Sequence, residues 1–254
     1  GTVLSLEKCK EAVAAGAQFI VAPGFNEKIV AWCVENDVAV TPGCVTPTEI
    51  EAALAYGIHV VKFFPAGTYG GVSACKSLYG PYRSANVSFI PTGGVDICNL
   101  AEYADKPFIH AVGGSWLCKT SAISSHDFDS ITASARASID VLLGFELAHV
   151  GINGTDDDQS LSVVKRLNQA FSFPVKEGSS SNMAGTGFEV TKSPYLGEHG
   201  HLAVRTNNIA RAIHALGKRG FEVDEDTAKY KNGRMIAIYL KESFGGFAVH
   251  LLQK

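Results

Sequence analysis

A single lysine lies inside an otherwise apolar segment, Val60–Pro65. The two-residue periodicity of a strand places Val60, Lys62 and Phe64 on one face. An amine buried in such a strand is poorly hydrated, which disfavours its charged form and lowers its pKa. A neutral amine can attack a ketone, so Lys62 is a candidate Schiff-base nucleophile. The alternative is a structural lysine paired with a buried carboxylate.

Two glycine pairs follow later in the same half of the chain, in Pro91–Asp96 and in Val112–Trp116. Each pair is predicted to lie where a strand runs into a helix. Glycine lets the backbone approach an anion closely, and the first N–H groups of a helix point toward it. Two consecutive turns of this kind favour a phosphate site, because β/α barrels commonly bind phosphate after their last strands. The alternative is tight-turn geometry alone.

The elements that must position these residues form a repeating strand–helix pattern. The predicted strands are apolar on both faces, as in a parallel sheet covered by helices. Most of them end at or next to Pro or Gly, which puts turn chemistry at their carboxyl ends. The strands are Thr2–Ser5, Phe19–Pro23, Val38–Pro42, Val60–Pro65, Val87–Pro91 and Phe108–Val112; the helices are Glu7–Ala15, Glu27–Glu35, Pro47–Tyr56, Gly71–Tyr79, Ile97–Ala104 and Phe128–Phe145.

Six strand–helix units do not close an eight-stranded barrel. The sheet is either open and doubly wound, or a barrel without its first two units. The chain begins at Gly1, and its only methionines are Met183 and Met235. We therefore expect a processed chain or a fragment, which favours the second alternative.

The second half changes character after Phe145, where cysteines disappear and strands with alternating polarity begin. The pattern is a strand, a helix and further strands, twice over, which is a weak internal repeat. Ser179–Gly187 is predicted to be a loop. The strands are Ala148–Ile152, Phe188–Lys192, Gly200–Val204, Phe221–Asp224, Arg234–Leu240 and Gly246–Leu252, with helices Ser160–Ala170 and Asn208–Arg219.

Composition narrows the class of protein. A length of 254 residues corresponds to about 1.7 domains. The net charge of −3, without a basic run, argues against nucleic-acid and membrane-surface partners. No apolar stretch is long enough to span a membrane, and no signal peptide is recognisable. All six cysteines lie in the first half without a C-x-x-C pair, which predicts buried thiols in a reducing cytoplasm.

Motifs in the first half resemble those of 2-keto-3-deoxy-6-phosphogluconate (KDPG) and 4-hydroxy-2-oxoglutarate (KHG) aldolases. The resemblance runs from Gly1 to about Phe145 and rests on several motifs in the family's order. These motifs are Val61–Ala66, Pro91–Gly94, Gly113–Trp116, Gly1–Leu4, Ala17–Phe19, Pro23–Gly24, Pro42–Gly43 and Tyr79–Pro81.

This resemblance implies a class I aldolase, a carbon–carbon lyase of carbohydrate metabolism in the Entner–Doudoroff pathway, on a (β/α)8 TIM barrel that needs no cofactor. It implies a homotrimer that cleaves a small-molecule 2-keto acid to pyruvate and either glyceraldehyde 3-phosphate or glyoxylate. Lys62 would form the Schiff base. The substrate contacts would be Thr2, Pro23, Phe64 and Thr92, and the phosphate would be held by Gly93, Gly94, Gly114 and Ser115.

Members of that family also carry a general-base glutamate and a carboxylate-binding arginine. The segments that hold them would precede Gly1 when Thr2–Leu4 is matched to the family's third strand. We therefore expect a barrel lacking its first two units, over residues 1–146, and impaired aldolase activity in the chain as given.

Residues 147–254 resemble the vicinal oxygen chelate fold of glyoxalases and dioxygenases, which pairs two βαβββ modules around a divalent metal. The ligand positions implied are His149 and His201 on the first strand of each module, with Glu189 and His250 on the last strands. Three imidazoles and one carboxylate suit Zn, Ni, Fe or Mn. The alternative is a metal-free lobe whose histidines pair locally or face solvent.

Three functions from different classes remain open. The first is a Schiff-base aldolase with an accessory domain. The second is a bifunctional enzyme that adds a metal-dependent glyoxalase-like or dioxygenase-like activity. The third is a non-catalytic small-molecule-binding or assembly module.

Overall fold

The computed structural model describes residues 2–254. The chain divides into two compact units, Gly1–Leu142 and Leu143–Lys254. The division lies between residues 142 and 143, whereas the sequence predicts a boundary between 146 and 147. No helix within residues 2–254 has the length and hydropathy needed to cross a membrane.

Four short strands of the first unit run parallel in chain order. They are β1 (Phe19–Val21), β2 (Ala39–Thr41), β3 (Val60–Phe63) and β4 (Ser88–Pro91). β1 pairs with β2, and β3 pairs with β4. A parallel bridge between Gly43 and Lys62 joins the two pairs. The site-bearing carboxyl ends of these strands therefore lie at one edge.

The predicted strands at the two ends of this series are not regular strands. Thr2–Ser5 contributes one hydrogen bond, from Val3 N to Val21 O. Phe108–Val112 only bridges Phe89 through Ile109, and Gly113 bridges Thr92. Each of these two segments has a described strand on one side only, and it makes isolated contacts with that strand in place of a continuous ladder.

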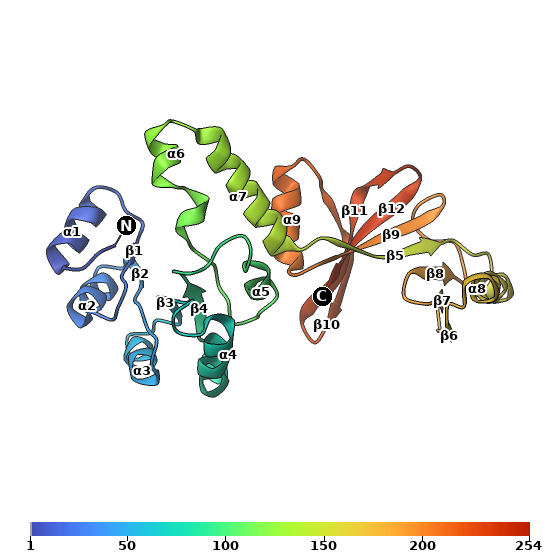
Figure 1. Cartoon of the computed structure of the whole chain (residues 1–254). Helices are drawn as coiled ribbons and strands as arrows, with labels where there is room; N and C mark the ends of the chain where they lie inside the picture. Colours follow the sequence, from blue (N-terminus) through green and yellow to red (C-terminus); the bar gives the residue numbers. More distant parts are fainter. Residues whose placement is uncertain (1) are drawn as a thin grey trace. The chain divides into compact units, whose positions relative to one another are not determined.

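The connecting helices lie along one side of the strands (Figure 1). Helix α3 shows how its sequence starts it, because Thr46 and Glu49 form a reciprocal capping box and Pro47 occupies the first turn. These helices are α1 (Leu6–Ala14), α2 (Glu27–Glu35), α3 (Pro47–Ala55) and α4 (Gly71–Tyr82), the last followed by a 3-10 turn η1 (Arg83–Ala85).

Helical structure after β4 differs from the prediction. The helix expected over Ile97–Ala104 is reduced to α5 (Ala101–Ala104), and Gly114 leads into a 3-10 turn, η2 (Ser115–Leu117). The glycine pairs therefore do not lead directly into regular α-helices. A phosphate at these turns would be bound by backbone N–H groups of the turns and not by the N-terminus of an α-helix. The chain then continues through α6 (Thr120–Ser124) and α7 (Phe128–Leu143).

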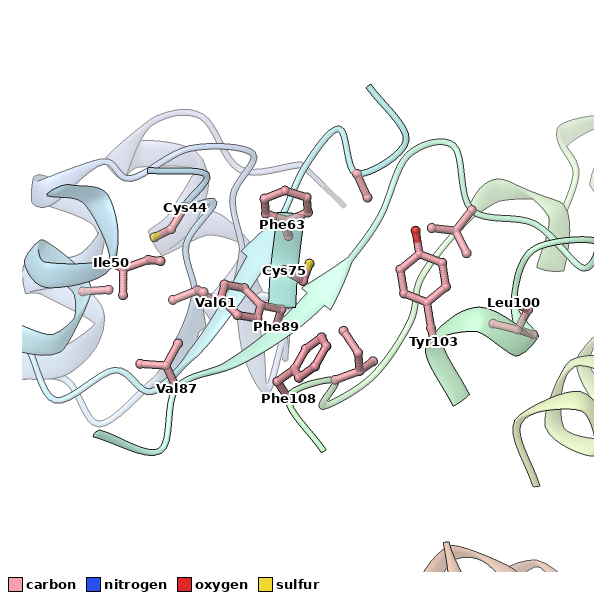
Figure 2. Close-up of a cluster of buried hydrophobic side chains, with 14 residues drawn as sticks. Cys44, Ile50, Val61, Phe63, Cys75, Val87, Phe89, Leu100, Tyr103 and Phe108 are labelled. Carbon is pink, nitrogen blue, oxygen red and sulfur yellow. The ribbon is translucent and has the colours of Figure 1, made fainter. Parts of the chain in front are cut away.

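The core of the first unit lies on the helix side of β3 and β4. Val61 and Phe63 of β3 are buried there, and the Phe63 ring meets Phe89 edge-on at 6.1 Å (Figure 2). Such aromatic pairs add about 0.5–1.5 kcal/mol beyond burial. Cys44 and Cys75 belong to this core. The expectation that all cysteines are buried is wrong for two of them, since Cys98 and Cys118 are exposed.

The second unit contains an eight-stranded sheet in the order β10-β11-β12-β9-β5-β8-β7-β6. Each half of the sheet has the element order βαβββ. The first module comprises β5 (Glu146–Ile152), α8 (Asp157–Phe171), β6 (Val175–Glu177), β7 (Ser181–Ala184) and β8 (Phe188–Thr191); the second comprises β9 (Gly200–Thr206), α9 (Ile209–Lys218), β10 (Val223–Lys231), β11 (Arg234–Phe244) and β12 (Phe247–Gln253).

The two modules are related by an internal two-fold arrangement. In each, the first and last strands pair in parallel, and the two first strands, β5 and β9, pair antiparallel at the centre. The prediction of a loop over Ser179–Gly187 is wrong, because β7 lies inside it, and β6 was not predicted at all. Gly and Ser carry no strand signal, so pairing with β8 decides the conformation of β7.

Candidate functional site

Lys62 is placed by alternation along β3. Its strand neighbours Val61 and Phe63 are buried in the core, so Lys62 points to the opposite face, where it is half-buried. Its backbone is held by Pro42 O and Cys44 N on one side, at 2.8 Å each. On the other side β3 pairs with β4, with Ile90 opposite Lys62. Because β3 is hydrogen-bonded along both edges at Lys62, the backbone that carries the amine is held in a fixed position.

The Lys62 amine has no anionic partner among the residues that the structure describes. No carboxylate within residues 2–254 forms an ion pair with it, and its Nζ instead lies 4.8 Å from the centre of the Phe64 ring. Burial lowers the pKa of the Lys62 amine. The structural alternative, a lysine paired with a buried carboxylate, is therefore contradicted by the structure.

Backbone contacts bring the neighbouring predicted site residues toward this lysine. A Cβ on Gly43 would lie 2.0 Å from Pro23 O, so only glycine permits this close approach between the ends of β1 and β2. Gly93 has a φ of +81°, and a Cβ there would lie 2.9 Å from the Phe64 ring. Phe64 thus contacts both the amine and the glycine turn.

Thr92 and the glycine pair after it are tied to the loop that follows β3. Ala66 N donates to Thr92 O at 2.8 Å, and Gly67 N donates to Gly93 O at 2.9 Å. The Thr92 hydroxyl is buried without a hydrogen-bond partner in the described residues. An unpartnered buried hydroxyl is costly, which suits a side chain that meets a bound ligand.

Other predicted positions are less closely connected to Lys62. Thr2 is exposed, and β1 and β2 separate its segment from β3 in the strand order. Ser115 is exposed in η2, and Gly114 precedes it in an extended conformation against the Trp116 ring. These two residues follow the Thr92–Gly113 bridge, which brings both glycine pairs to the same edge.

Comparison with known proteins places the first unit. The family model for KDPG and KHG aldolase matches residues 1–134. The chain belongs to this aldolase family. The 2-dehydro-3-deoxy-phosphogluconate aldolase of Treponema pallidum is 46% identical over 142 residues, 56% of this chain and 67% of that protein. The KHG/KDPG aldolase of Escherichia coli is 36% identical over 140 residues, 55% of this chain and 65% of that protein.

Solved aldolase structures share the fold of the same half of the chain. The KDPG aldolase of Legionella pneumophila, with pyruvate captured as a covalent carbinolamine, is 32% identical with a TM-score of 0.51. That match covers 54% of this chain and 65% of the other. The chain thus spans about two thirds of the length of the aldolases it matches. The sheet-rich second unit lies outside the family match.

Strand register gathers the predicted metal ligands of the second unit on one face of its sheet. Gly151, two residues after His149 on β5, lies opposite Glu189 on β8. Ala203, two residues after His201 on β9, lies opposite His250 on β12. His149 and His201 are therefore two-fold equivalents, and Glu189 is the equivalent of His250.

The four side chains also meet. The carboxylate oxygen Glu189 Oε2 lies 2.9 Å from His149 Nε2 and 3.3 Å from His201 Nε2. The two Nε2 atoms are 3.1 Å apart. Each of the three histidines offers a ring nitrogen within 4.8 Å of the others. The small residues between them make room: a Cβ on Gly151 would lie 2.0 Å from the His201 ring.

The electrostatics of this cluster favour cation binding. Hydrogen bonds from His149 and His201 lower the pKa of Glu189, which keeps the carboxylate charged. Burial, followed by His201 and His149, lowers the pKa of His250 to about 3, which leaves a neutral imidazole with a free lone pair. His250 Nε2 and His201 Nδ1 are buried without hydrogen-bond partners among the described residues. Such orphaned nitrogens are expected at a site that takes a ligand.

Two contacts around the cluster could not be predicted from the sequence. The Tyr239 ring stacks on His250 at 4.6 Å and 13°, from directly opposite on β11. The Ser181 hydroxyl donates to Glu189 Oε1 at 2.6 Å. Ser181 lies in the segment predicted to be a loop, so no strand alternation was available to place it. The only signal was its separation of eight residues from Glu189, a hairpin distance.

Proposed function

We propose that the first unit is a Schiff-base aldolase acting on KDPG, on KHG, or on both. The observation that carries the proposal is the Lys62 amine. It is half-buried, lacks a counter-charge within residues 2–254, and is held at the carboxyl end of a strand in an aldolase-family unit. The six parallel segments would correspond to six of the eight units of the family's barrel. A trimer in the cytoplasm is part of the same proposal.

The chemistry follows from the amine. Neutral Lys62 adds to the C2 ketone to form a carbinolamine, and loss of water gives an iminium ion. The C3–C4 bond then breaks: its electron pair moves toward the iminium as the C4 hydroxyl loses its proton. The departing aldehyde leaves an enamine of pyruvate on Lys62. Protonation of the enamine carbon and hydrolysis release pyruvate and regenerate the amine.

Neighbouring residues would bind the two ends of the substrate. Thr2, Pro23 and Phe64 would line the pyruvate end, and Phe64 supports the amine through its ring. The unpartnered Thr92 hydroxyl would donate to the substrate. The phosphate of KDPG would lie against the backbone of the turns at Gly93, Gly94, Gly114 and Ser115.

Borohydride trapping with pyruvate tests the amine itself. We expect reduction to add the pyruvate skeleton covalently to one peptide, with fragmentation mass spectrometry placing it on Lys62. Lys76→Met, which removes an exposed lysine on α4, is the matched control and should leave the label in place. A label on any other lysine, or none at all, would remove the Schiff-base assignment. Release of pyruvate from KDPG and from KHG then separates the substrates.

We propose a second function for the second unit, a divalent metal centre in a vicinal-oxygen-chelate-like fold. The orphaned Nε2 of His250, the convergence of three imidazoles and the charged Glu189 fit such an ion. His149, His201, His250 and Glu189 would hold it, and the ion would also take an oxygen atom of a bound small molecule as a ligand. A bound metal would supply Lewis-acid polarisation of that oxygen.

Metal analysis of the purified protein tests this centre. We expect one divalent ion per chain after loading with Zn²⁺ or Co²⁺ and desalting. His201→Ala should lower the affinity at least about 100-fold, whereas His214→Ala, an exposed histidine on α9, should have no effect. Equal metal content in wild type and His201→Ala would remove the proposal. The outcome does not depend on the aldolase test.

A further inference from the structure

The two halves of the histidine cluster differ in the residues that β7 and β11 place beside Glu189 and His250. On β7, Met183 lies opposite Glu189 and Ser181 lies opposite Thr191. On β11, Tyr239 lies opposite His250 and Ala237 lies opposite Leu252. Because Glu189 and His250 are equivalent, Ser181 and Ala237 are equivalent too. The chain therefore has a hydroxyl beside the carboxylate and a methyl group beside the imidazole.

The hydroxyl occupies one oxygen of that carboxylate. Ser181 Oγ donates to Glu189 Oε1 at 2.6 Å, while Oε2 faces His149 Nε2 at 2.9 Å and His201 Nε2 at 3.3 Å. A carboxylate can bind a metal through one oxygen or through both. A short bond from a hydroxyl to an ionised oxygen is a strong hydrogen bond, so turning Oε1 toward a metal would require breaking it.

The opposite ligand is oriented by different means. His250 has one ring face against Tyr239, stacked at 4.6 Å, and the Ala237 methyl group offers no hydrogen bond. An aromatic stack sets the plane of an imidazole, whereas a freely rotating carboxylate needs a directional partner. Ser181 on β7 therefore fixes the orientation of Glu189, as the stacked Tyr239 on β11 fixes the orientation of His250.

We propose that Ser181 is a positioning residue of the metal centre, which holds Glu189 so that only Oε2 is presented to the ion. This inference rests on the metal centre proposed above. One-oxygen binding by Glu189 keeps a coordination position open for an exogenous ligand. Ser181 itself does not touch the metal.

Cobalt binding to the full chain tests the proposal. We expect Ser181→Ala to weaken Co²⁺ binding about 10–100-fold, the usual effect of losing a hydrogen bond to a metal ligand. The visible Co²⁺ bands should also lose intensity, because a freed Oε1 raises the coordination number. Azide should perturb the wild-type bands more than those of the variant, since the open position is then closed.

Two further variants separate positioning from a merely structural role. Ser181→Thr keeps the hydroxyl and should restore both the affinity and the spectrum. Ser180→Ala removes an exposed hydroxyl one residue away on the same hairpin and should behave as wild type. If Ser181→Ala matches wild type in affinity and spectrum, the positioning role is overturned and the metal centre stands. If wild type itself binds no Co²⁺, both proposals fail.

Discussion

The two candidate sites of this chain differ in how their ionisable side chains are surrounded. At the first, the Lys62 amine lies beside the Phe64 ring, and no carboxylate within the described residues pairs with it. At the second, charged and basic groups converge, and Glu189 connects two imidazoles to a serine. A nucleophilic amine is more reactive when no carboxylate stabilises its charged form. A metal centre binds its ion more tightly when several ligand side chains point to the same place.

The difference also extends to the backbone. Around Lys62, close approach depends on glycines, such as Gly43 against Pro23 and Gly93 against the Phe64 ring. Around Glu189, strand register brings side chains from β5, β8, β9 and β12 together. Substitutions near the first site should therefore act through backbone conformation, and those near the second through lost ligands.

The largest expected effect is that of Lys62→Met, which should abolish pyruvate trapping completely. It should also raise the free energy of unfolding of the first unit, because it removes a half-buried amine that lacks a counter-charge. Tryptophan fluorescence reads this unit selectively, since Trp32 and Trp116 both belong to it. His250→Ala, the matching change in the second unit, should leave trapping intact. Residual pyruvate trapping by Lys62→Met would show that Lys62 is not the reacting amine.

The pH dependence of trapping should be the next largest effect. Burial lowers the pKa of Lys62, so the neutral amine persists to lower pH than at an exposed lysine, whose pKa is about 10.4. The initial rate should rise about tenfold per pH unit below the Lys62 pKa and level off above it. Cyanoborohydride reduction at saturating pyruvate measures this profile. A midpoint at the value of an exposed lysine would contradict the desolvated amine.

Gly93→Ala should have a smaller effect that reports the contact with Phe64. Its φ of +81° makes alanine strained by about 1–2 kcal/mol, and the new Cβ would meet the Phe64 ring at 2.9 Å. Gly57→Ala is the matched control, with a φ of +73° and no atom within 4 Å of its Cβ. Urea unfolding followed by tryptophan fluorescence should show destabilisation for both, with the larger loss for Gly93→Ala because its Cβ also meets the Phe64 ring. Only Gly93→Ala should slow pyruvate trapping. Equal trapping rates for the two variants would show that the position of Phe64 does not affect the Lys62 amine.

The smallest effect is expected from Asp156→Ala in the second unit. The Asp156 side chain caps α8 by accepting from Gln159 N at 2.8 Å, and losing such a cap costs about 1 kcal/mol. Asp158→Ala, in the first turn of the same helix, should cost less. Far-UV circular dichroism during urea unfolding reports both units and should detect this loss, while the transition followed by tryptophan fluorescence should not change. A loss detected by fluorescence would contradict the separation of the two units.

Helices and strands could be predicted from the sequence where their local residue preferences agree with the conformation that packing imposes. Helix α2 has the predicted bounds Glu27–Glu35, and α3 begins at Pro47 as predicted. Strand β7 was missed because Ser and Gly encode no preference that would outweigh a loop. The helix expected at Ile97 shortened to four residues, since a turn held by Asn99 at Gly94 O precedes it.

Residue types and their spacing are enough to identify the family of the first unit, the single lysine in an apolar strand and the repeat in the second half, because each is a local property of a segment. The absence of a carboxylate beside Lys62 in the described residues and the hydrogen bond from Ser181 to Glu189 follow from the folded arrangement. Both depend on which strands become neighbours and in which register, and a shift of one residue would turn each side chain to the other face.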